Sequence, residues 1–386
     1  MPIYDVRHQG RALRLIQRAL DGGRIAHAYI FYGPDGVGKE LFARRLAAIL
    51  LCASRRRTPA ADLPDDCGWD RPIIDACGSC RSCHLADAGT HPDLHLVHRY
   101  LNVHHPDPDI RKRKAVDLGV GVIRHFLIAP CGIKPAMGQA RVFIVREADR
   151  ISPGAQNALL KTLEEPPPTV HLILLAESTD RLLPTTRSRC QLVTFGGLPR
   201  DFVARRLMTL VESLTADDAR LYAALSGGSV GTALRFAAQN LIGVNEQVVT
   251  ALSSLSRSNA LQTAGQFVAI AKQLAQDQRR DDPALSDTAA LRRGLSIILR
   301  LAATFYDDAL RIACDAGHLP ANAWAGDRVE RIARTAGADA LDKMIPVLAG
   351  AEWALGRSVN TQLAVESLMF DLVNAAAGQP ITAVAH

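Results

Sequence analysis

Short apolar runs alternate with longer helical patterns in the N-terminal half of the chain. Four runs have the length and composition of buried strands: His27–Tyr32, Leu94–Val97, Val142–Val145 and Val170–Leu175. Between them, apolar residues recur at intervals of three and four, as in residues 39–52. Strands that alternate with helices are typical of a parallel sheet covered on both faces. Residues 1–197 are therefore predicted to form an α/β domain.

The strand pattern stops near residue 200. Residues 198–245 contain short helical segments, and residues 246–386 contain longer ones. Apolar residues at alternating intervals of four and three predict a helix that packs against others: Leu291, Leu295, Ile298, Ala302, Phe305, Ala309 and Ile312. The polar segment Gln276–Pro283 is predicted to be a loop. Two all-helical parts are therefore expected after the α/β domain.

One glycine-rich segment carries candidate chemistry. Residues 33–39 match the phosphate-loop pattern G-x-x-x-x-G-K, and they lie between a predicted strand and a predicted helix, as that motif requires. In such a loop, backbone N–H groups and the lysine bind phosphate, and a following Ser or Thr holds Mg²⁺. The candidate phosphate-binding residues are Gly33, Gly36, Gly38 and Lys39.

The residues that would hold the metal are replaced. Glu40 stands where the loop needs Ser or Thr, and Arg146 follows the strand at Val142–Val145 where an Asp is expected. Their opposite charges lead us to expect an ion pair in place of Mg²⁺, the alternative being independent drift of two unused positions. Glu147 and Asp149 remain, but a water-activating carboxylate has little to act on without the metal.

The expected consequence is a loop that supports no productive Mg-ATP. Lys39 and the glycines remain, so weak binding of ATP or ADP without metal is one interpretation. The other is a loop that serves only to pack the domain.

Three cysteines at two-residue spacing, Cys77, Cys80 and Cys83, indicate a metal site. Cys52 is the predicted fourth ligand, with Cys67 as the alternative. Four thiolates leave no open coordination position, so the expected ion is structural zinc. The competing interpretation is a set of unrelated free cysteines.

Composition and charge narrow the class of protein only slightly. The 386 residues are 48% hydrophobic and carry a net charge of +6, which permits a polyanionic partner without requiring one. No apolar run is long enough to span a membrane, and the N-terminus lacks a signal peptide, so a cytoplasmic protein is expected. The basic run Arg111–Lys114 is typical of a solvated loop, with contact to DNA phosphates as the alternative.

Longer motifs give a specific resemblance. The segment Asn157–Pro167, the triplet Ser188–Cys190 and the segment Ala88–Asp93, taken with the cysteine group, resemble the bacterial DNA polymerase III clamp-loader family. The similarity is greatest to its delta-prime subunits, which are of the AAA+ class. More loosely, Ser358–Leu368 resembles the last collar helix of that family.

The resemblance implies an architecture and partners. It implies an AAA+ P-loop domain with a zinc-binding insertion at about residues 52–90, a helical lid over 198–245 and a helical collar over 246–386. The partners it implies are gamma/tau-type ATPase subunits and a delta subunit in a ring. It further implies indirect contact with the sliding clamp, contact with primer-template DNA through the complex, and no membrane association.

The resemblance also implies a role for one arginine. In the family, the Ser-Arg-Cys motif projects its arginine toward ATP held by the neighbouring subunit, and here that residue is Arg189. Active members carry another arginine at the start of a lid helix, where this chain has Gly231. The implied protein is a non-hydrolysing, delta-prime-type subunit that acts in replication as part of the DNA polymerase holoenzyme.

Two other functions compete with this one. The first is an active gamma/tau-type ATPase, against which Glu40, Arg146 and Gly231 argue. The second is a zinc-dependent nucleic-acid-binding module that acts alone, against which the long helical C-terminal region argues.

Overall fold

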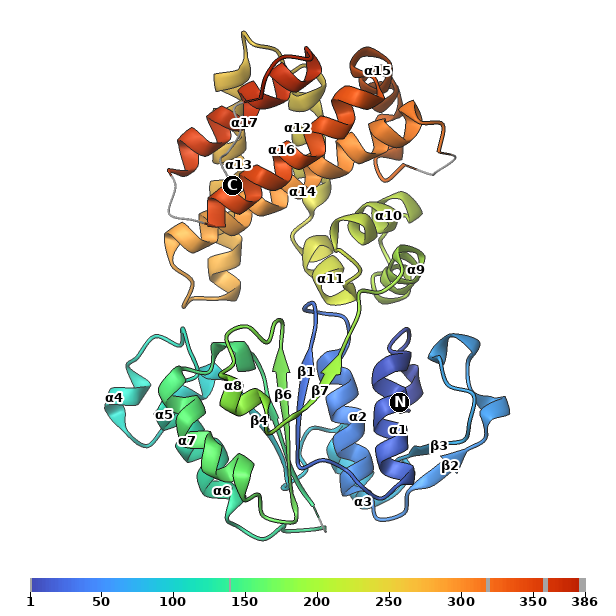
Figure 1. Ribbon diagram of the computed structural model, residues 1–386, viewed down its shortest axis with the longest axis vertical. Helices are drawn as coiled ribbons and strands as arrows, with labels where there is room; N and C mark the ends of the chain where they lie inside the picture. Colours follow the sequence, from blue (N-terminus) through green and yellow to red (C-terminus); the bar gives the residue numbers. More distant parts are fainter. Residues whose placement is uncertain (1, 139, 317–319, 357–359, 382–386) are drawn as a thin grey trace. The chain divides into compact units, whose positions relative to one another are not determined.

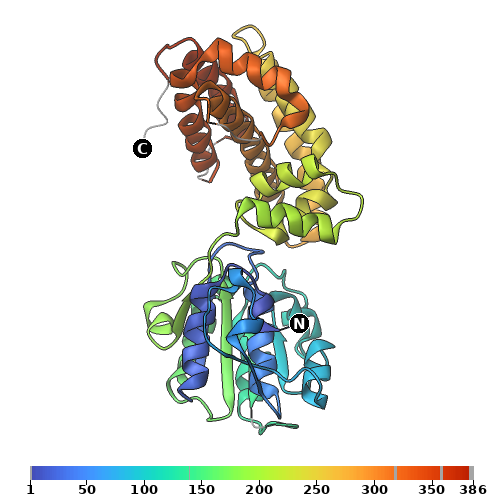
Figure 2. The ribbon, with the colours of Figure 1, turned by 90° about the vertical axis from the view of Figure 1, so that its right-hand side faces the viewer.

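The computed structural model describes residues 2–138, 140–316, 320–356 and 360–381 (Figures 1 and 2). The chain divides into two compact units, Met1–Pro199 and Arg200–His386. The further boundary expected at residue 245, between a lid and a collar, stays a prediction.

Five parallel strands form the central sheet of the first unit, in the order β4-β5-β6-β1-β7. Four of them correspond to the predicted strands: β1 (Ala28–Tyr32), β4 (Leu94–Val97), β5 (Arg141–Val145) and β6 (Val170–Ala176). Because the strands are parallel, the segments that follow β1 and β5 leave the same edge of the sheet. That edge is where parallel α/β sheets place their binding sites.

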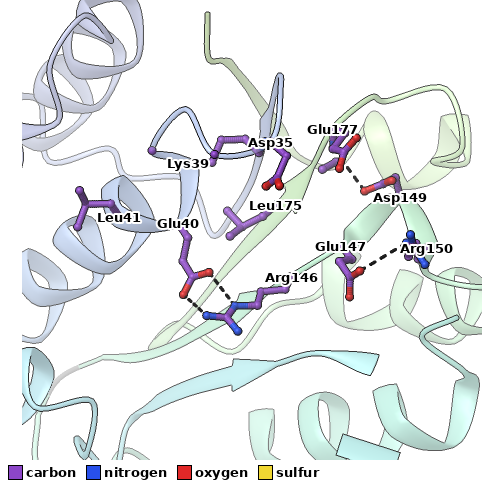
Figure 3. A pocket seen from close by; sticks show the side chains of 13 residues that line it. Asp35, Lys39, Glu40, Leu41, Arg146, Glu147, Asp149, Arg150, Leu175 and Glu177 are labelled. Carbon is purple, nitrogen blue, oxygen red and sulfur yellow. Dashed lines mark hydrogen bonds and ion pairs between the residues drawn. The ribbon is translucent and has the colours of Figure 1, made fainter. Parts of the chain in front are cut away.

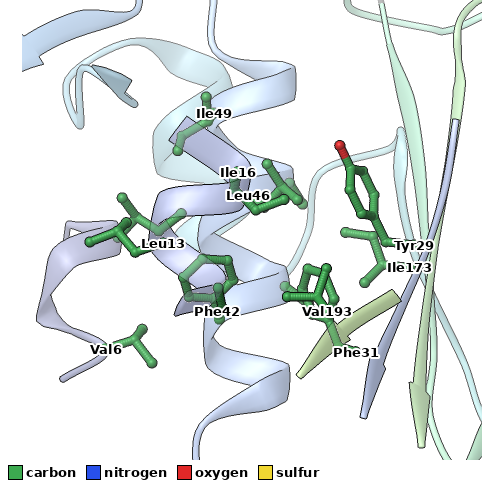
Figure 4. Close-up of a cluster of buried hydrophobic side chains, with 14 of the residues drawn as sticks. Val6, Leu13, Ile16, Tyr29, Phe31, Phe42, Leu46, Ile49, Ile173 and Val193 are labelled. Atoms are coloured by element: carbon green, nitrogen blue, oxygen red, sulfur yellow. The ribbon is translucent and has the colours of Figure 1, made fainter. Parts of the chain in front are cut away.

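The sheet separates two hydrophobic cores. Tyr29 and Phe31 of β1 contribute to the core beneath α1 (Gly10–Asp21) and α2 (Lys39–Leu51), which Figure 4 shows. Ala28 and Ile30 of the same strand contribute to the other core, which α7 (Pro153–Glu164) covers. Both faces of the interior strands β1, β5 and β6 are buried, which explains why these strands are largely apolar in the sequence.

The remaining helices of the first unit are short. They are α3 (Arg81–Asp87), α4 (Pro108–Arg111), α5 (Val120–Ile123), α6 (Ala129–Cys131) and α8 (Pro184–Arg187). A turn of π-helix, Arg124–Ile128, joins α5 to α6.

Three strands of this unit are absent from the sequence predictions. β7 (Gln191–Thr194) is an edge strand in which only Val193 is buried, so its apolar signal is weak. β2 (Arg56–Thr58) and β3 (Ile73–Asp75) form a two-stranded antiparallel sheet inside the cysteine-containing insertion. Strands of three residues are too short for a period-two pattern to indicate them.

The insertion is attached to the N-terminal segment by buried and partly buried hydrogen bonds. The side chain of Gln17 on α1 exchanges two hydrogen bonds with the backbone of Ile74, at 2.8 and 2.9 Å. The backbone N–H of Ile3 donates to the buried carboxylate of Asp75 at 3.1 Å. The insertion is therefore packed as part of the first unit.

The second unit is helical throughout the part that the structure describes, as the sequence predicts. Its α-helices are α9 (Arg200–Leu210), α10 (Ala216–Leu225), α11 (Val230–Ala238), α12 (Leu241–Ser253), α13 (Ala260–Asp281), α14 (Asp287–Ala313), α15 (Gly326–Ala336), α16 (Ala338–Gly356) and α17 (Thr361–Ala376). Among the described residues, no helix combines the length and the apolar character that a membrane span needs.

Two expectations for this unit need comment. The loop predicted over Gln276–Pro283 is wrong, because α13 continues to Asp281. Arg280 pairs with Asp277 at 3.1 Å within its last turns, and basic residues near a helix C-terminus are favoured by the helix dipole. Ser358 and Val359 lie outside the described residues, and the rest of the segment compared with a collar helix falls on Asn360, which caps α17, and on α17 itself.

Candidate functional site

The loop from Gly33 to Lys39 joins β1 to α2 through conformations that favour glycine. Gly33 and Gly38 have φ angles of 145° and 104°. A Cβ atom on Gly33 would lie 2.1 Å from the carbonyl oxygen of Phe195, which is closer than any side chain tolerates. The glycines are thus required by the path of the backbone itself, whether or not a ligand binds.

Lys39 folds back onto its own loop. Its side chain is buried, and Nζ donates to the carbonyl oxygens of Gly33 and Pro34, both at 2.6 Å. Burial lowers the pKa of Lys39, although nearby carboxylates such as Asp35 act in the opposite direction. A phosphate group would have to compete with two backbone carbonyls for this ammonium group.

The predicted ion pair between Glu40 and Arg146 is present (Figure 3). Nε and Nη2 of Arg146 donate to the two carboxylate oxygens of Glu40 at 2.7 and 2.5 Å. Arg44, one turn along α2, donates to the same carboxylate at 2.9 Å. Burial raises the pKa of Glu40, but the hydrogen bonds and positive charges of the two arginines outweigh it and hold that pKa below its usual value.

Glu147, the candidate water-activating carboxylate, is also held by arginines. Nε of Arg99 donates to its two carboxylate oxygens at 3.0 and 3.2 Å, and Nε of Arg150 lies 3.5 Å away. Glu147 has a left-handed backbone, with φ of 51°. Arg99 is buried and follows β4, the neighbour of β5 in the sheet. Sequence reasoning missed it, although its place after a parallel strand next to β5 could have indicated it.

A cavity of about 350 Å³ at the edge of the sheet is lined by Lys39, Glu40, Arg146 and Glu147, among others. Five of its lining residues are acidic and three are basic, so its formal charge is −2: Asp35, Glu40, Glu147, Asp149 and Glu177 against Lys39, Arg146 and Arg150. A site that binds a triphosphate needs a positive balance, from cationic side chains or from a metal ion. The side chains that line this cavity do not give a positive balance, and Arg44 and Arg99, which pair with Glu40 and Glu147 from outside the lining, bring the sum only to zero.

Arg189 lies on the surface of the first unit, just after α8. Its side chain is 34% exposed, and Nη2 lies 2.7 Å from a carboxylate oxygen of Glu164. Nη1 donates to the carbonyl oxygen of Thr185 at 3.0 Å and to the hydroxyl of Ser188 at 3.3 Å. The guanidinium is therefore accessible and has a defined direction. Sequence analysis did not predict Glu164 as its partner.

A buried glutamine holds the loop that leads to Arg189. The side chain of Gln156, on α7, donates to the carbonyl oxygens of Ile151 and Arg181 at 3.0 and 3.1 Å. Its amide oxygen accepts from Leu183 N–H at 2.8 Å and from the hydroxyl of Thr186 at 3.3 Å. The segment of residues 181–186, which ends three positions before Arg189, is thus attached to α7.

The predicted thiols come together. Of the described residues, Cys52, Cys77, Cys80 and Cys83 place their sulfur atoms within 4.8 Å of one another, and neighbouring sulfurs are 3.5 to 4.0 Å apart. Tetrahedral zinc with Zn–S bonds of about 2.3 Å needs sulfurs about 3.8 Å apart. The cluster therefore fits a four-thiolate zinc ion. Backbone N–H groups of Ser79 and Cys80 lower the pKa of Cys77 to about 6, whereas burial raises the pKa of Cys52 and Cys83.

The alternative ligand lies elsewhere. Cys67 is buried in the first hydrophobic core, and its sulfur is 3.5 Å from the carbonyl oxygen of Trp69. It is not part of the four-sulfur group. Cys52, which directly follows the last residue of α2, takes that place.

Two further features from the sequence analysis are not among the residues that line the cavity. Gly231 is in the first turn of α11, in the second unit, where it offers no charged side chain. The four side chains of Arg111–Lys114 are exposed. Two buried side chains hold the backbone of this segment and of the residue that follows it. Arg99 donates to the carbonyl oxygen of Ala115 at 2.6 Å, and Asn102 donates to that of Arg113 at 2.7 Å.

Known proteins resemble this chain over its first unit and beyond. A family model described as "DNA polymerase III, delta subunit" matches residues 8–199. The delta' subunit of Pseudomonas aeruginosa DNA polymerase III is 35% identical over 239 residues, or 61% of this chain and 63% of that protein. The delta' subunit of Escherichia coli is 32% identical over 213 residues, or 55% and 54%.

Gamma/tau subunits match at a similar level. The gamma/tau subunit of Mycobacterium tuberculosis is 32% identical over 236 residues, or 60% of this chain and 36% of that protein. Matches to the delta' relatives span between 46% and 63% of those proteins' own length. The chain is thus about equally identical in sequence to delta' and to gamma/tau subunits. The residues of the site therefore have to decide which subunit type it resembles in function.

Proposed function

Through residues 8–199 the chain belongs to the DNA polymerase III delta' family, and from this premise we propose that it is a non-hydrolysing clamp-loader subunit. In this proposal the chain has the AAA+ design, with a degenerate phosphate loop in the first unit. It helps to load the sliding clamp onto primed DNA during replication, without ATPase activity of its own.

The ion pair of Glu40 and Arg146 carries this proposal. It occupies the space where a phosphate-loop enzyme needs a hydroxyl and a carboxylate for Mg²⁺. Arg146 satisfies both oxygens of Glu40, so the pair also removes the carboxylate as a metal ligand. The lack of a positive charge balance in the cavity and the inward-folded Lys39 support the same conclusion. A gamma/tau-type ATPase is disfavoured for these reasons.

Arg189 is the group that the chain contributes to catalysis. It is exposed, it has a defined direction, and it belongs to the Ser-Arg-Cys motif. An arginine supplied to a neighbouring ATP neutralises the charge that develops on the transferred phosphate. The neighbouring subunit is proposed to be of the gamma/tau type, with a delta subunit in the same ring. The clamp and the primer-template DNA are then reached through the complex.

The four-cysteine cluster is proposed to hold structural zinc. Cys52, Cys77, Cys80 and Cys83 would supply the four thiolates, which leaves no position for a substrate. The ion would join the end of α2 to the insertion, since Cys52 and the other three ligands lie 25 or more residues apart in the sequence.

Calorimetric titration of the isolated chain with Mg-ATP tests the inactive pocket. We expect no hydrolysis, and no binding that strengthens when Mg²⁺ is added, because the metal ligands are missing. Submillimolar, magnesium-dependent binding with turnover would contradict the proposal and favour the gamma/tau-type alternative.

A further inference from the structure

We propose that Glu164 is a positioning residue for Arg189: its carboxylate fixes the direction of the guanidinium that a neighbouring nucleotide meets. The inference rests on the proposed role of Arg189 in a clamp loader. It adds a residue on a different element, whose effect on catalysis would pass entirely through the arginine.

The contacts of Arg189 define two kinds of support. Nη1 is held by groups next to the arginine in sequence, the carbonyl of Thr185 and the hydroxyl of Ser188. Nη2 is held at 2.7 Å by Glu164, which is 25 positions earlier in the sequence. Each of the two terminal nitrogens of Arg189 is therefore held by a different set of contacts. The planar guanidinium cannot turn about its long axis without losing one of them.

Helix α7 supports the arginine at both of its ends. Gln156, near its start, makes the hydrogen bonds that attach residues 181–186. Glu164 is the last residue of the same helix and contacts Arg189 directly. Arg189 and the segment that carries it are therefore both held by one rigid helix, α7. A cation at this place is also favoured by the negative end of the helix dipole.

The exposure of the pair suits a contact that is exchanged on binding. The side chains of Arg189 and Glu164 are 34% and 48% exposed, and ion pairs at such exposure are weak because water screens them. A multiply charged phosphate can displace the carboxylate from Nη2 while Thr185 and Ser188 retain Nη1. Glu164 thus holds the arginine ready without competing strongly with the nucleotide.

Variants in the reconstituted assembly test this role. Full-length chains carrying Glu164→Ala, Glu164→Gln or the control Glu165→Ala are combined with gamma/tau-type and delta subunits. ATP hydrolysis is then measured with primed DNA over a range of ATP concentrations. Glu165 follows Glu164 directly and is exposed, so it controls for loss of a charge at this helix end.

We expect Glu164→Ala to lower kcat about threefold to tenfold, because misdirection of a catalytic group by about 1 Å costs rate. Glu164→Gln keeps an oxygen that can accept from Nη2, so its kcat should stay within about twofold of the natural protein. Glu165→Ala should change neither kcat nor KM. In an Arg189→Ala background, Glu164→Ala should have no further effect.

Three results would overturn the inference. They are equal kcat values for Glu164→Ala and Glu165→Ala, equal losses for Glu164→Ala and Glu164→Gln, and a Glu164→Ala effect that persists without Arg189. A fourth result, an unchanged rate in Arg189→Ala alone, would refute the proposed trans role itself and the inference with it. The Arg189→Ala measurement therefore distinguishes the two failures. Gel filtration confirms that each assembly is intact.

Discussion

Glu40 and Arg146 are 106 positions apart in the sequence, yet their side chains share two hydrogen bonds. Their pairing was predictable because a parallel sheet brings the loop after β1 and the residue after β5 to one edge, and their charges are opposite. Arg44 and Arg99 were not predicted, although the sequence contained a signal for each. Arg44 follows Glu40 by four residues on the same helix, and Arg99 follows a strand next to β5.

A double-mutant cycle on Glu40→Gln and Arg146→Gln measures the strength of this pair. Each variant should lower the free energy of unfolding by about 1 kcal/mol, the upper range for a half-exposed pair with two hydrogen bonds. The double variant should lose less than the sum. Urea denaturation measures the three values, with Lys112→Gln in the exposed basic run as a control. Strictly additive losses would show that the pair is not coupled.

The coupling energy that this double-mutant cycle measures should depend on pH. The arginines hold the pKa of Glu40 below its unfolded value, so its contribution is present above the unfolded pKa, near 4.3. That contribution should fade as the pH falls through the lower, folded pKa. We therefore expect the coupling energy to be constant from pH 8 to about pH 5 and to decrease below about pH 4. A coupling energy that grows on acidification would contradict this assignment.

At the scale of elements, the sequence predicted the strands and helices that contain apolar runs. It did not predict the segments that are polar or very short. The three interior strands, β1, β5 and β6, are largely apolar and buried on both faces, so their sequence signal is strong. The edge strand β4 was identified as well, because three of its four residues are apolar, although only Val97 is buried. The edge strand β7 buries a single residue, and the last turns of α13 are polar because they face solvent. Both were missed because polar residues leave too few apolar positions in these segments to produce a pattern.

The packing of α13 against α14 depends on Gly294. A Cβ atom there would lie 2.5 Å from the backbone carbonyl oxygen of Ala271, and backbone cannot move aside cheaply. Gly294→Ala should therefore lower the free energy of unfolding by about 1–3 kcal/mol. Gly265→Ala, at an open position on α13, should raise it by up to about 1 kcal/mol because alanine favours the helix. Equal effects of the two variants in thermal denaturation would contradict the close approach.

The thiol cluster predicts a specific response to loss of metal. The purified chain should contain one zinc ion, and Cys80→Ser should abolish it, whereas Cys67→Ser should retain it. Chelation should expose the insertion to proteases first, because its strands are short. Elemental analysis and limited proteolysis provide the two readouts. Zinc loss in Cys67→Ser with retention in Cys52→Ser would show that the wrong fourth ligand was assigned.

At the scale of the whole molecule, the described residues form an α/β unit and a helical unit, as the sequence predicted. The first contains a phosphate-loop pocket whose metal side is occupied by an internal ion pair, together with an arginine exposed on its surface. The phosphate-loop pattern predicted the pocket, and the motifs that carry the family resemblance predicted the arginine. The contacts that orient Arg189, from Glu164 and Gln156, became visible only in three dimensions.

The central claim is that this chain supplies an arginine to another subunit's ATP. It is tested most directly by DNA-stimulated ATP hydrolysis in the reconstituted clamp loader, comparing Arg189→Ala with Arg187→Ala. Arg187 is exposed two residues earlier and serves as the matched control. We expect Arg189→Ala to lower kcat at least tenfold with the assembly intact, since arginine fingers contribute large factors to kcat, and Arg187→Ala to leave it unchanged. An unchanged rate in the intact Arg189→Ala assembly would contradict the account.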